Sequence, residues 1–482
     1  MLLPIDGPNI NLCKLLLGLY YLEYPTPVLV SWGQHGTDTK KFRAAGTHLT
    51  KITSMHEYLQ SLPSSADNDL VVMVDTVDVW VQLPASVLIS RYHAALKSTL
   101  DTFASQTNGQ NTIEVHHLMN SIIFGSGKKC APMQYHTIAC YPMPDSPLPD
   151  DLYGANTDSV LGREPYFSYR QRYLNSGFIM GPLAAMRKMF AEAQRRLDTT
   201  PLIDPEDNGS GKANNLYRGS DQSIFARMLG RQEWAREALR VGWNQDRARK
   251  GFETQRTWPW QASELKPREG RMHGLRFDNV LEPNFSHEPM NYTEFEDDPS
   301  QFEFGIALDY WSDLVYQTNS NSEEDARWLV MGELDGREAR MEEQVEKAFP
   351  RNKFDCPKMR LPMTIPLDMS NAQLAEMPDW EYEKLYMHVC LGKIPAFVHR
   401  NTVNATGFKS ALETDWYNIW YLQQGKERVS GTTGIESGIP DFEHFKLAPQ
   451  PVPSVIAWTK DGDHLPWNVL CPAEWNPGLF SV

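Results

Sequence analysis

The sequence predicts an α/β fold built on a mostly parallel sheet. Apolar runs typical of strands alternate with helical stretches from residue 1 to about 230. Residues 69–75 read Asp-Leu-Val-Val-Met-Val-Asp, and an unbroken apolar run of this length is typical of a strand buried on both faces. A hydrophobic fraction of 41% and a charged fraction of 22% over 482 residues indicate a globular chain with a full core.

The predicted elements follow in chain order. Strands are expected over residues 1–6, 27–32, 69–75, 173–181 and 302–310, and residues 387–399 return to the same core pattern. Helices are expected over residues 11–21, 55–62, 85–100, 182–197 and from 220 to at least 230. Pro182 opens the fourth helix, because proline is favoured in a first turn. A strand at the very start of the chain predicts a missing leader or a mis-called start; the alternative is a complete chain whose first strand lies at the sheet edge.

Composition excludes several classes of protein. Lys and Arg number 46 against 61 Asp and Glu, which gives a net charge of −15. This argues against a nucleic-acid partner, because an excess of acidic residues repels the phosphate backbone. No run reaches the roughly 18 apolar residues that a membrane span needs, so no transmembrane segment is predicted. The N-terminus lacks the basic and apolar regions of a signal peptide.

The compartment is left open by the six cysteines, which are too few for a disulfide scaffold. Cys130 and Cys140 are close enough to pair across a loop in an oxidising lumen. Four Asn-x-Ser/Thr sequons are compatible with a secretory lumen and are common by chance in a chain of this length. They are Asn208, Asn284, Asn291 and Asn404.

A pair of carboxylates follows the predicted strand 69–75. Asp75 and Asp78 lie three residues apart at its carboxyl end, where open α/β sheets bind ligands. Two oxygen ligands there suit Mg²⁺ or Mn²⁺, which can bridge to a diphosphate. The alternative is that Asp75 caps the following turn and Asp78 is solvated, since Asp-x-x-Asp is a common spacing.

Three later segments add to this pair. They are Leu174-Asn175-Ser176-Gly177, Ser220-Asp221-Gln222 and Pro395-Ala396-Phe397-Val398-His399. With the strand-end Asp-x-x-Asp they resemble the nucleotide-sugar-dependent glycosyltransferases of GT-A fold. The similarity is greatest to the glycosyltransferase domain of procollagen lysyl hydroxylases and to the related collagen galactosyltransferases, and the chain also resembles fungal proteins of this type.

The resemblance implies a metal site. Asp75 and Asp78 match the residues that bind manganese, or Mg²⁺ in its place, together with the UDP of the donor, and His399 matches the third protein ligand. Because His399 must be neutral to ligate, metal binding should weaken below roughly pH 6.5. The alternative for His399 is a histidine satisfied within the fold at a strand end.

The resemblance also implies a sugar site. Asn175, Ser176 and Gly177 match its wall, and Asp221 with Gln222 matches a pair that faces the donor sugar and the acceptor. The alternative for the first three is a tight strand-to-helix turn in which Gly177 supplies backbone freedom. For Asp221 the alternative is a helix N-cap or first-turn acid worth about 1 kcal/mol.

Two positions depart from the family pattern. The family continues its late motif as His-Gly-Asn-Gly, whereas this chain has Arg400 after the histidine, and that side chain either grips a phosphate or obstructs the site. Lys51 matches a donor-binding lysine in a Gly-rich stretch, but its spacing from Gly46 differs. A further match, Leu308-Asp309-Tyr310 to Gln317-Thr318-Asn319, keeps the family order.

The matched motifs run from the first strand to His399, although length alone suggests about three domains. We therefore expect one GT-A-like domain over residues 1–410 with an insertion at about 320–384. A Trp- and Pro-rich extension, 411–482, is expected to pack on the same domain.

The function implied is a divalent-metal-dependent glycosyltransferase of the secretory pathway, in the Golgi or endoplasmic reticulum, or secreted. It would move a hexose from a UDP-sugar to a hydroxyl on a protein or glycan acceptor. One alternative is a non-catalytic nucleotide-sugar or carbohydrate-binding protein on a degenerate GT-A fold. The other is a metal-dependent phosphodiesterase or pyrophosphatase, for which the sequence lacks the further ligands of a two-metal site.

Overall fold

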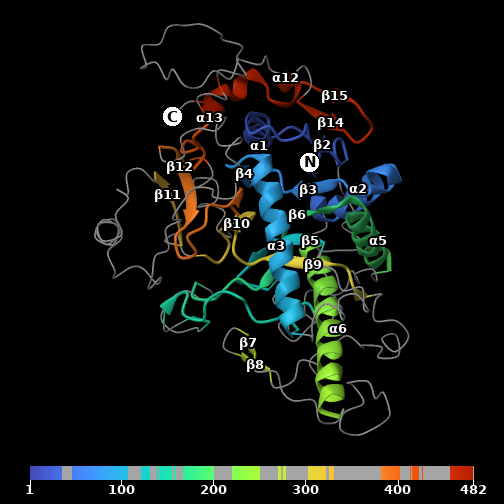
Figure 1. Ribbon diagram of the computed structural model, residues 1–482. Coiled ribbons are helices and arrows are strands. Elements are labelled where there is room, and N and C mark those ends of the chain that lie inside the picture. The colour runs from blue at the N-terminus through green and yellow to red at the C-terminus, as the bar shows by residue number, and fades with distance from the viewer. Residues whose placement is uncertain are drawn as a thin grey trace, which may run out of the picture.

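The fold is described from a computed structural model of the chain (Figure 1). It describes residues 1–34, 46–106, 121–130, 138–140, 142–154, 157–158, 167–199, 220–249, 270–272, 275–277, 302–321, 325–330, 382–401, 413, 415–422, 426 and 456–480. The four sequons and most of the expected insertion lie outside these residues.

An eight-stranded mixed sheet forms the centre of the molecule, in the order β15-β14-β2-β1-β3-β6-β5-β9. Its strands are β1 (Leu2–Leu3), β2 (Val28–Leu29), β3 (Leu70–Val74), β5 (Ile122–Gly127), β6 (Tyr173–Pro182), β9 (Ile306–Asp309), β14 (Ala457–Thr459) and β15 (His464–Leu465). Four neighbouring pairs are parallel, whereas β6 is antiparallel to β3 and β5, and β15 to β14. The predicted mostly parallel α/β sheet is confirmed, and β1 lies inside it instead of at an edge.

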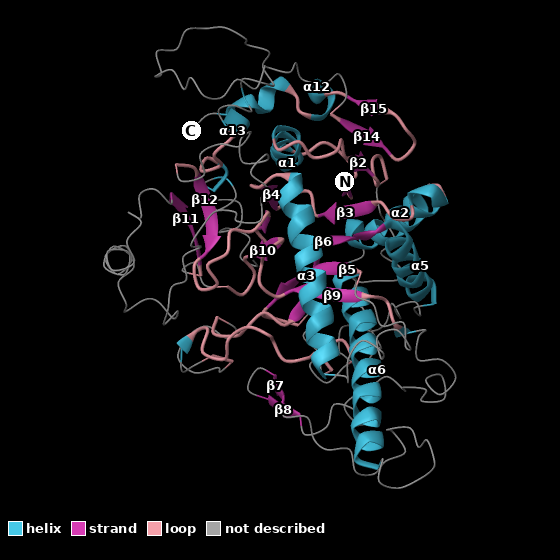
Figure 2. Ribbon diagram, viewed as in Figure 1, coloured by secondary structure: helices cyan, strands magenta, loops and turns pink. Residues whose placement is uncertain are grey.

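Helices cover both faces of this sheet (Figure 2). Helices α1 (Ile10–Tyr21) and α3 (Ala85–Gln106) pack in one core, and α2 (Gly46–Ser61), α5 (Leu183–Thr199) and α6 (Asp221–Arg249) in the other. Along β3, Val72 and Val74 enter the first core, and Val71 and Met73 the second. The apolar run at 69–75 therefore serves both faces, as its lack of alternation predicted.

Among the residues that the structure describes, three smaller sheets accompany the central one. A three-stranded sheet joins β10 (Val315–Gln317), β13 (Phe397–His399) and β4 (Val79–Val81), and β13 is parallel to β10 and antiparallel to β4. Two antiparallel two-stranded sheets are formed by β11 (Ala326–Val330) with β12 (Lys384–His388) and by β7 (Gly270–Met272) with β8 (Leu275–Phe277). Strand β11 lies within the segment expected as a surface insertion, so part of that segment is ordered against β12.

The C-terminal extension is built into the core. Strand β14 extends the central sheet beside β2, and Cys13 of α1 forms a disulfide with Cys471, 458 positions later. Trp420 and Tyr421 donate hydrogen bonds to the backbone oxygens of Gln82 and Val81, next to β4. The extension ends in helix α12 (Trp467–Leu470), a short 3₁₀ turn at Ala473–Trp475 and helix α13 (Asn476–Phe480). Another 3₁₀ turn, at Ser64–Ala66, lies between α2 and β3.

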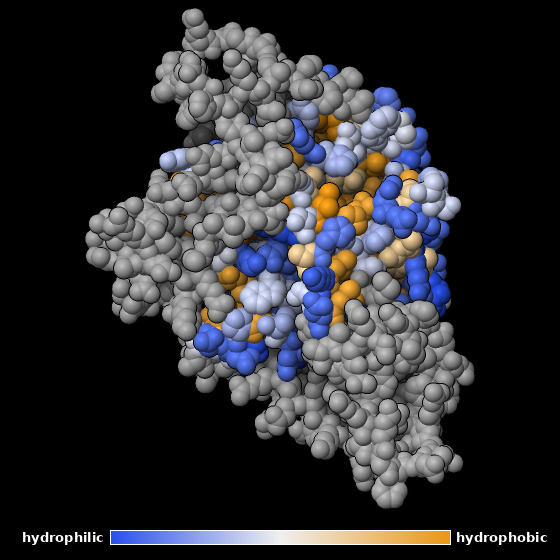
Figure 3. Space-filling model, viewed as in Figure 1, coloured by the Kyte–Doolittle hydropathy of each residue, from blue (hydrophilic) through white to orange (hydrophobic). Residues whose placement is uncertain are grey.

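Cys130 and Cys140, which are close enough in the sequence to pair, form a disulfide, and Cys390 is also disulfide-bonded. On the face shown in Figure 3, hydrophilic residues are interspersed with apolar ones. On helix α3 the apolar side chain of Ile89 is 43% exposed. Among the described helices, none is both long and apolar enough to cross a bilayer.

Candidate metal centre

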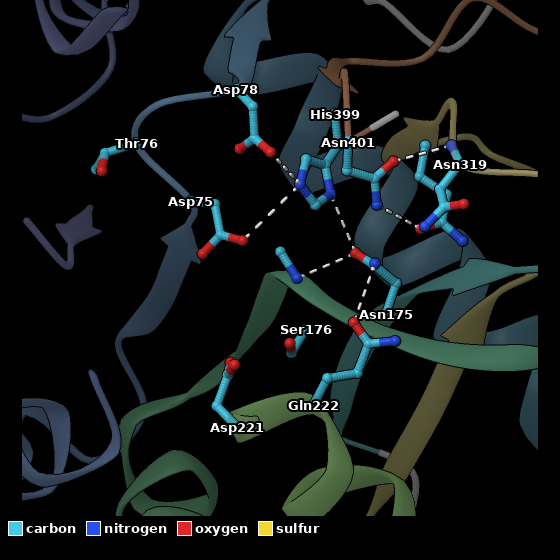
Figure 4. Close-up of polar contacts among 12 residues, drawn as sticks. Asp75, Thr76, Asp78, Asn175, Ser176, Asp221, Gln222, Asn319, His399 and Asn401 are labelled. Atoms are coloured by element: carbon cyan, nitrogen blue, oxygen red, sulfur yellow. Dashed lines mark hydrogen bonds and ion pairs between the residues drawn. The ribbon is translucent and has the colours of Figure 1, made fainter. Parts of the chain in front are cut away.

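Backbone pairing brings three distant segments to the carboxyl end of β3. The Asp75 amide donates to the Gly177 oxygen at 2.9 Å, which continues the pairing of β3 with β6. The antiparallel register of β4 and β13 sets Val79 opposite His399, and the backbone amide of Arg400 donates to the backbone oxygen of Asp78 at 2.7 Å. The side chains of Asp75, Asp78 and His399 therefore converge (Figure 4).

The three predicted ligands form a compact group. One donor atom from each of Asp75, Asp78 and His399 lies within 4.8 Å of the other two. His399 Nε2 is 3.2 Å from Asp78 Oδ2 and 3.8 Å from Asp75 Oδ2. Adjacent ligands of an octahedral ion at about 2.1 Å lie about 3 Å apart, so a divalent cation fits between these atoms with small adjustments.

Asn175 fixes the imidazole of His399. Its Oδ1 accepts the Gly177 amide at 3.0 Å, which identifies this atom as the oxygen, and it lies 3.1 Å from His399 Nδ1. His399 must therefore donate from Nδ1–H, and Nε2 faces the two carboxylates. There Nε2 either carries a second proton or ligates a cation, and an amide partner of this kind is a common way to orient a ligating histidine.

The hydrogen bonding and charge of these three side chains also fit a bound cation. Asp78 Oδ1 is buried and has no hydrogen-bond partner among the described residues. Burial opposes the charged form of Asp78, but the His399 imidazolium and Lys51 outweigh this and lower its pKa. Burial likewise lowers the pKa of His399, but Asp78 and Asp75 raise it above 6.5. A proton on Nε2 therefore competes with a metal at higher pH than an isolated imidazole would.

Gly177 is required by close approach. A Cβ at this position would lie 2.1 Å from His399 Cε1 and 2.4 Å from Nδ1. Residues 175–177 lie within β6, where the pairing register with β5 shifts between Phe124 and Gly125. The alternative of a tight strand-to-helix turn is therefore wrong, and glycine is needed here because the histidine ring occupies the space of a side chain.

Lys51 joins the metal centre to the start of α6. Its Nζ lies 2.7 Å from Asp75 Oδ1, 2.9 Å from Asp221 Oδ2 and 3.0 Å from the Ser176 oxygen. The side chains of Lys51 and Asp221 are 6% and 5% exposed. Burial alone would lower the pKa of Lys51, but Asp221 and Asp75 raise it, so the ammonium form is held.

The sugar-site candidates line the same space. Gln222, beside Asp221 at the start of α6, accepts a hydrogen bond from Asn175 Nδ2 at 3.3 Å. Ser176 lies between Asp75 and Asp221 in Figure 4. Asp221 is the first residue of α6, and its carboxylate also contacts Lys51 on another helix. A helix-terminal acid and a site residue are thus compatible roles for it.

Arg400 is the one predicted site residue whose side chain is directed elsewhere. Its Nε lies 3.2 Å from Asp415 Oδ2, and Nη1 lies 3.5 Å from the Tyr386 hydroxyl. Trp328 donates to the other oxygen of Asp415 at 3.1 Å. Sequence reasoning missed Asp415, because an isolated acid in the C-terminal extension carries no signal of this pairing.

Carboxamides secure the chain after His399. Asn401 accepts the Asn319 amide at 2.9 Å and donates to Gln317 Oε1 at 3.0 Å, while Gln317 donates to the Ser126 oxygen at 2.9 Å. The matched segment at 317–319 thus supports the strand that carries His399. In the sequence, the order of this segment among the matched motifs was the signal that singled it out.

The structure thus brings Lys51, Asp75, Asp78, Asp221 and His399 together, with Asn175, Ser176, Gly177 and Gln222 beside them. The chain matches no protein-family model and no curated protein. Its chemistry must therefore be inferred from the geometry of this centre.

Proposed function

We propose that the protein is a divalent-metal-dependent glycosyltransferase that moves a hexose from a UDP-sugar to a hydroxyl on a protein or glycan. The single observation that carries this proposal is the group formed by Asp75, Asp78 and His399, with Asn175 setting the histidine tautomer. Two hard oxygens and one imidazole suit Mn²⁺ or Mg²⁺. A bound divalent cation would act as a Lewis acid that neutralises the departing diphosphate.

Each residue has a role that follows from its contacts. Asp75 Oδ2, Asp78 and His399 Nε2 would hold the metal, while Asn175 orients the imidazole through Nδ1. Asp221 and Gln222 begin α6 on the side opposite Asp78 and would contact the sugar and the acceptor (Figure 4). Gly177 makes room for the His399 ring by carrying no side chain.

The central sheet supports a GT-A-like fold for this function. Asp75 and Asp78 follow the carboxyl end of β3, an inner strand of a mixed, mostly parallel sheet, which is where α/β folds bind nucleotides. We also propose a secretory lumen or the outside of the cell. The disulfides Cys13–Cys471 and Cys130–Cys140 support this location, because such bonds persist in oxidising compartments.

Turnover of UDP-sugars tests the proposal. A panel of UDP-hexoses with Mn²⁺ should yield UDP, and Asp75→Asn and Asp78→Asn should each reduce this turnover at least about 100-fold. Asp461→Asn, at an exposed position, is the matched control and should retain full activity. Full activity in both ligand variants would refute the proposed function.

A non-catalytic nucleotide-sugar-binding protein would use the same metal centre. It predicts Mn²⁺-dependent UDP binding in calorimetry with no turnover of any donor, with or without candidate acceptors. A phosphodiesterase or pyrophosphatase would cleave donors without regard to the acceptor. Within the described residues one group of ligands is present, instead of the two adjacent metal sites that many such enzymes use.

A further inference from the structure

The ammonium group of Lys51 lies among three oxygens of the protein. A lysine has three N–H donors and no acceptor. Three oxygens, from Asp75, Asp221 and the Ser176 backbone, lie 2.7, 2.9 and 3.0 Å from its Nζ. Two of these contacts, to Asp75 Oδ1 and the Ser176 oxygen, are hydrogen bonds, and the contact to Asp221 Oδ2 is an ion pair. With its side chain 6% exposed, Lys51 is enclosed by these groups and presents little surface to a phosphate of the donor. The contacts therefore differ from those of a lysine that grips a diphosphate.

The two oxygens of the Asp75 carboxylate have different partners. Lys51 bonds Oδ1, while Oδ2 is the oxygen nearest to His399 Nε2. One oxygen is thus fixed by the ammonium and the other is directed at the metal centre. A carboxylate held in this way keeps its second oxygen in a single orientation, because rotation would break the buried ion pair.

Lys51 also accounts for the buried charge of Asp221. It is the ion-pair partner that the described residues provide for this carboxylate, whose side chain is 5% exposed. Three carboxylates, Asp75, Asp78 and Asp221, contribute −3, and Lys51 with one divalent cation contributes +3. The charges of the centre therefore balance when His399 is neutral and ligates the metal. Removing Lys51 would leave Asp221 buried and unpaired, which is costly.

We propose that Lys51 is a positioning residue that fixes Asp221 relative to the metal ligand Asp75, and that it does not bind the donor. The inference rests on the proposed function. Through this one ammonium, the start of α6, which would face the sugar and acceptor, is held at a set distance from the end of β3, which would face the diphosphate. Loss of the link should impair the transfer step more than donor binding.

The test combines Lys51→Met, Asp221→Asn and the double variant. We expect Lys51→Met to bind UDP in saturating Mn²⁺ within threefold of the wild type, by calorimetry, and to lose at least 100-fold in kcat. Adding Asp221→Asn to Lys51→Met should change kcat by less than threefold, because the two residues act as one unit. A tenfold loss of UDP affinity at unchanged kcat, or additive losses in kcat, would overturn the proposal.

The stability of the same variants keeps the test decisive. In urea unfolding, the double variant should be more stable than Lys51→Met, because it removes both buried charges together. It also provides a folded protein if Lys51→Met does not fold. The surface pair Lys460 and Glu57, 2.9 Å apart, is the matched control, and its double-mutant cycle should show no comparable coupling.

Failure of the two proposals is distinguishable. If the wild type turns over no UDP-sugar, the proposed function fails, and the link between Lys51 and Asp221 is then judged by UDP affinity and by the stability cycle. Unchanged UDP affinity with strong coupling supports the positioning role of Lys51. Weakened UDP affinity without coupling would overturn it.

Discussion

The Oδ1 atom of Asn175 lies 3.1 Å from His399 Nδ1 and at the same time accepts the Gly177 amide. This arrangement makes Asn175 the residue that orients a metal ligand, whereas the family resemblance assigned it only to the sugar site. One amide thus links β6 to the strand that carries His399.

Asn175→Ala should weaken Mn²⁺ binding about 10- to 100-fold, because the imidazole loses the partner that holds its orientation. Asn175→Asp keeps an acceptor for Nδ1–H and should retain most of the affinity. Titration of free Mn²⁺ by electron paramagnetic resonance measures both variants. Asn418→Ala, which removes an amide near the surface, is the control. Equal Mn²⁺ affinity in Asn175→Ala and the wild type would contradict the orienting role.

Gly177→Ala should displace the His399 ring, since the added Cβ would overlap it. We expect a loss of about 1–3 kcal/mol in the free energy of unfolding, as for other overpacked sites. Mn²⁺ affinity should fall together with it. Gly7→Ala is the matched control, because no heavy atom lies within 4 Å of a Cβ there. The close approach would be refuted if both glycine variants bound Mn²⁺ like the wild type.

Arg400→Ala should leave the affinity for UDP in saturating Mn²⁺ within about threefold of the wild type, because its guanidinium contacts Asp415 and Tyr386 instead of the metal centre. The free energy of unfolding should fall by about 1–3 kcal/mol, since Asp415 loses the charged one of its partners. Calorimetry and urea unfolding separate the two effects. A tenfold loss of UDP affinity would contradict this prediction and indicate that Arg400 binds a phosphate of the donor.

His388 should make the protein less stable in acid, independently of any metal. Burial, with a contribution from Lys128, lowers the pKa of His388 to about 3, and Nδ1 accepts the Leu391 amide. Because the unfolded chain binds this proton near pH 6.5, the stabilising contribution is complete above that pH. It is lost as the pH falls from 6.5 towards 3, by up to about 1.4 kcal/mol for each pH unit.

Urea unfolding at several pH values measures this slope. His388→Gln should unfold with a shallower pH dependence between pH 6.5 and 4 than the wild type. His93→Gln, at an exposed position on α3, should keep the wild-type slope. Identical slopes in all three proteins would show that His388 does not carry the effect.

Within the fold, the sequence by itself determined the central strands and their surroundings. The unbroken apolar run at 69–75 predicted burial on both faces, and β3 has it because helices cover both sides of the sheet. The two carboxylates after that run, and the order of the later motifs, predicted which segments would meet. These inferences succeeded because periodicity and strand ends are local properties of the chain.

Only the tertiary structure decided the partner of each polar side chain. Asn175 of β6 contacts His399 of β13, Lys51 pairs with groups from three segments, and Arg400 pairs with an acid of the C-terminal extension. Cys13 meets Cys471 across 458 positions, with β14 beside β2. Such pairings depend on the packing of segments far apart in the chain, and no local pattern of residues encodes them.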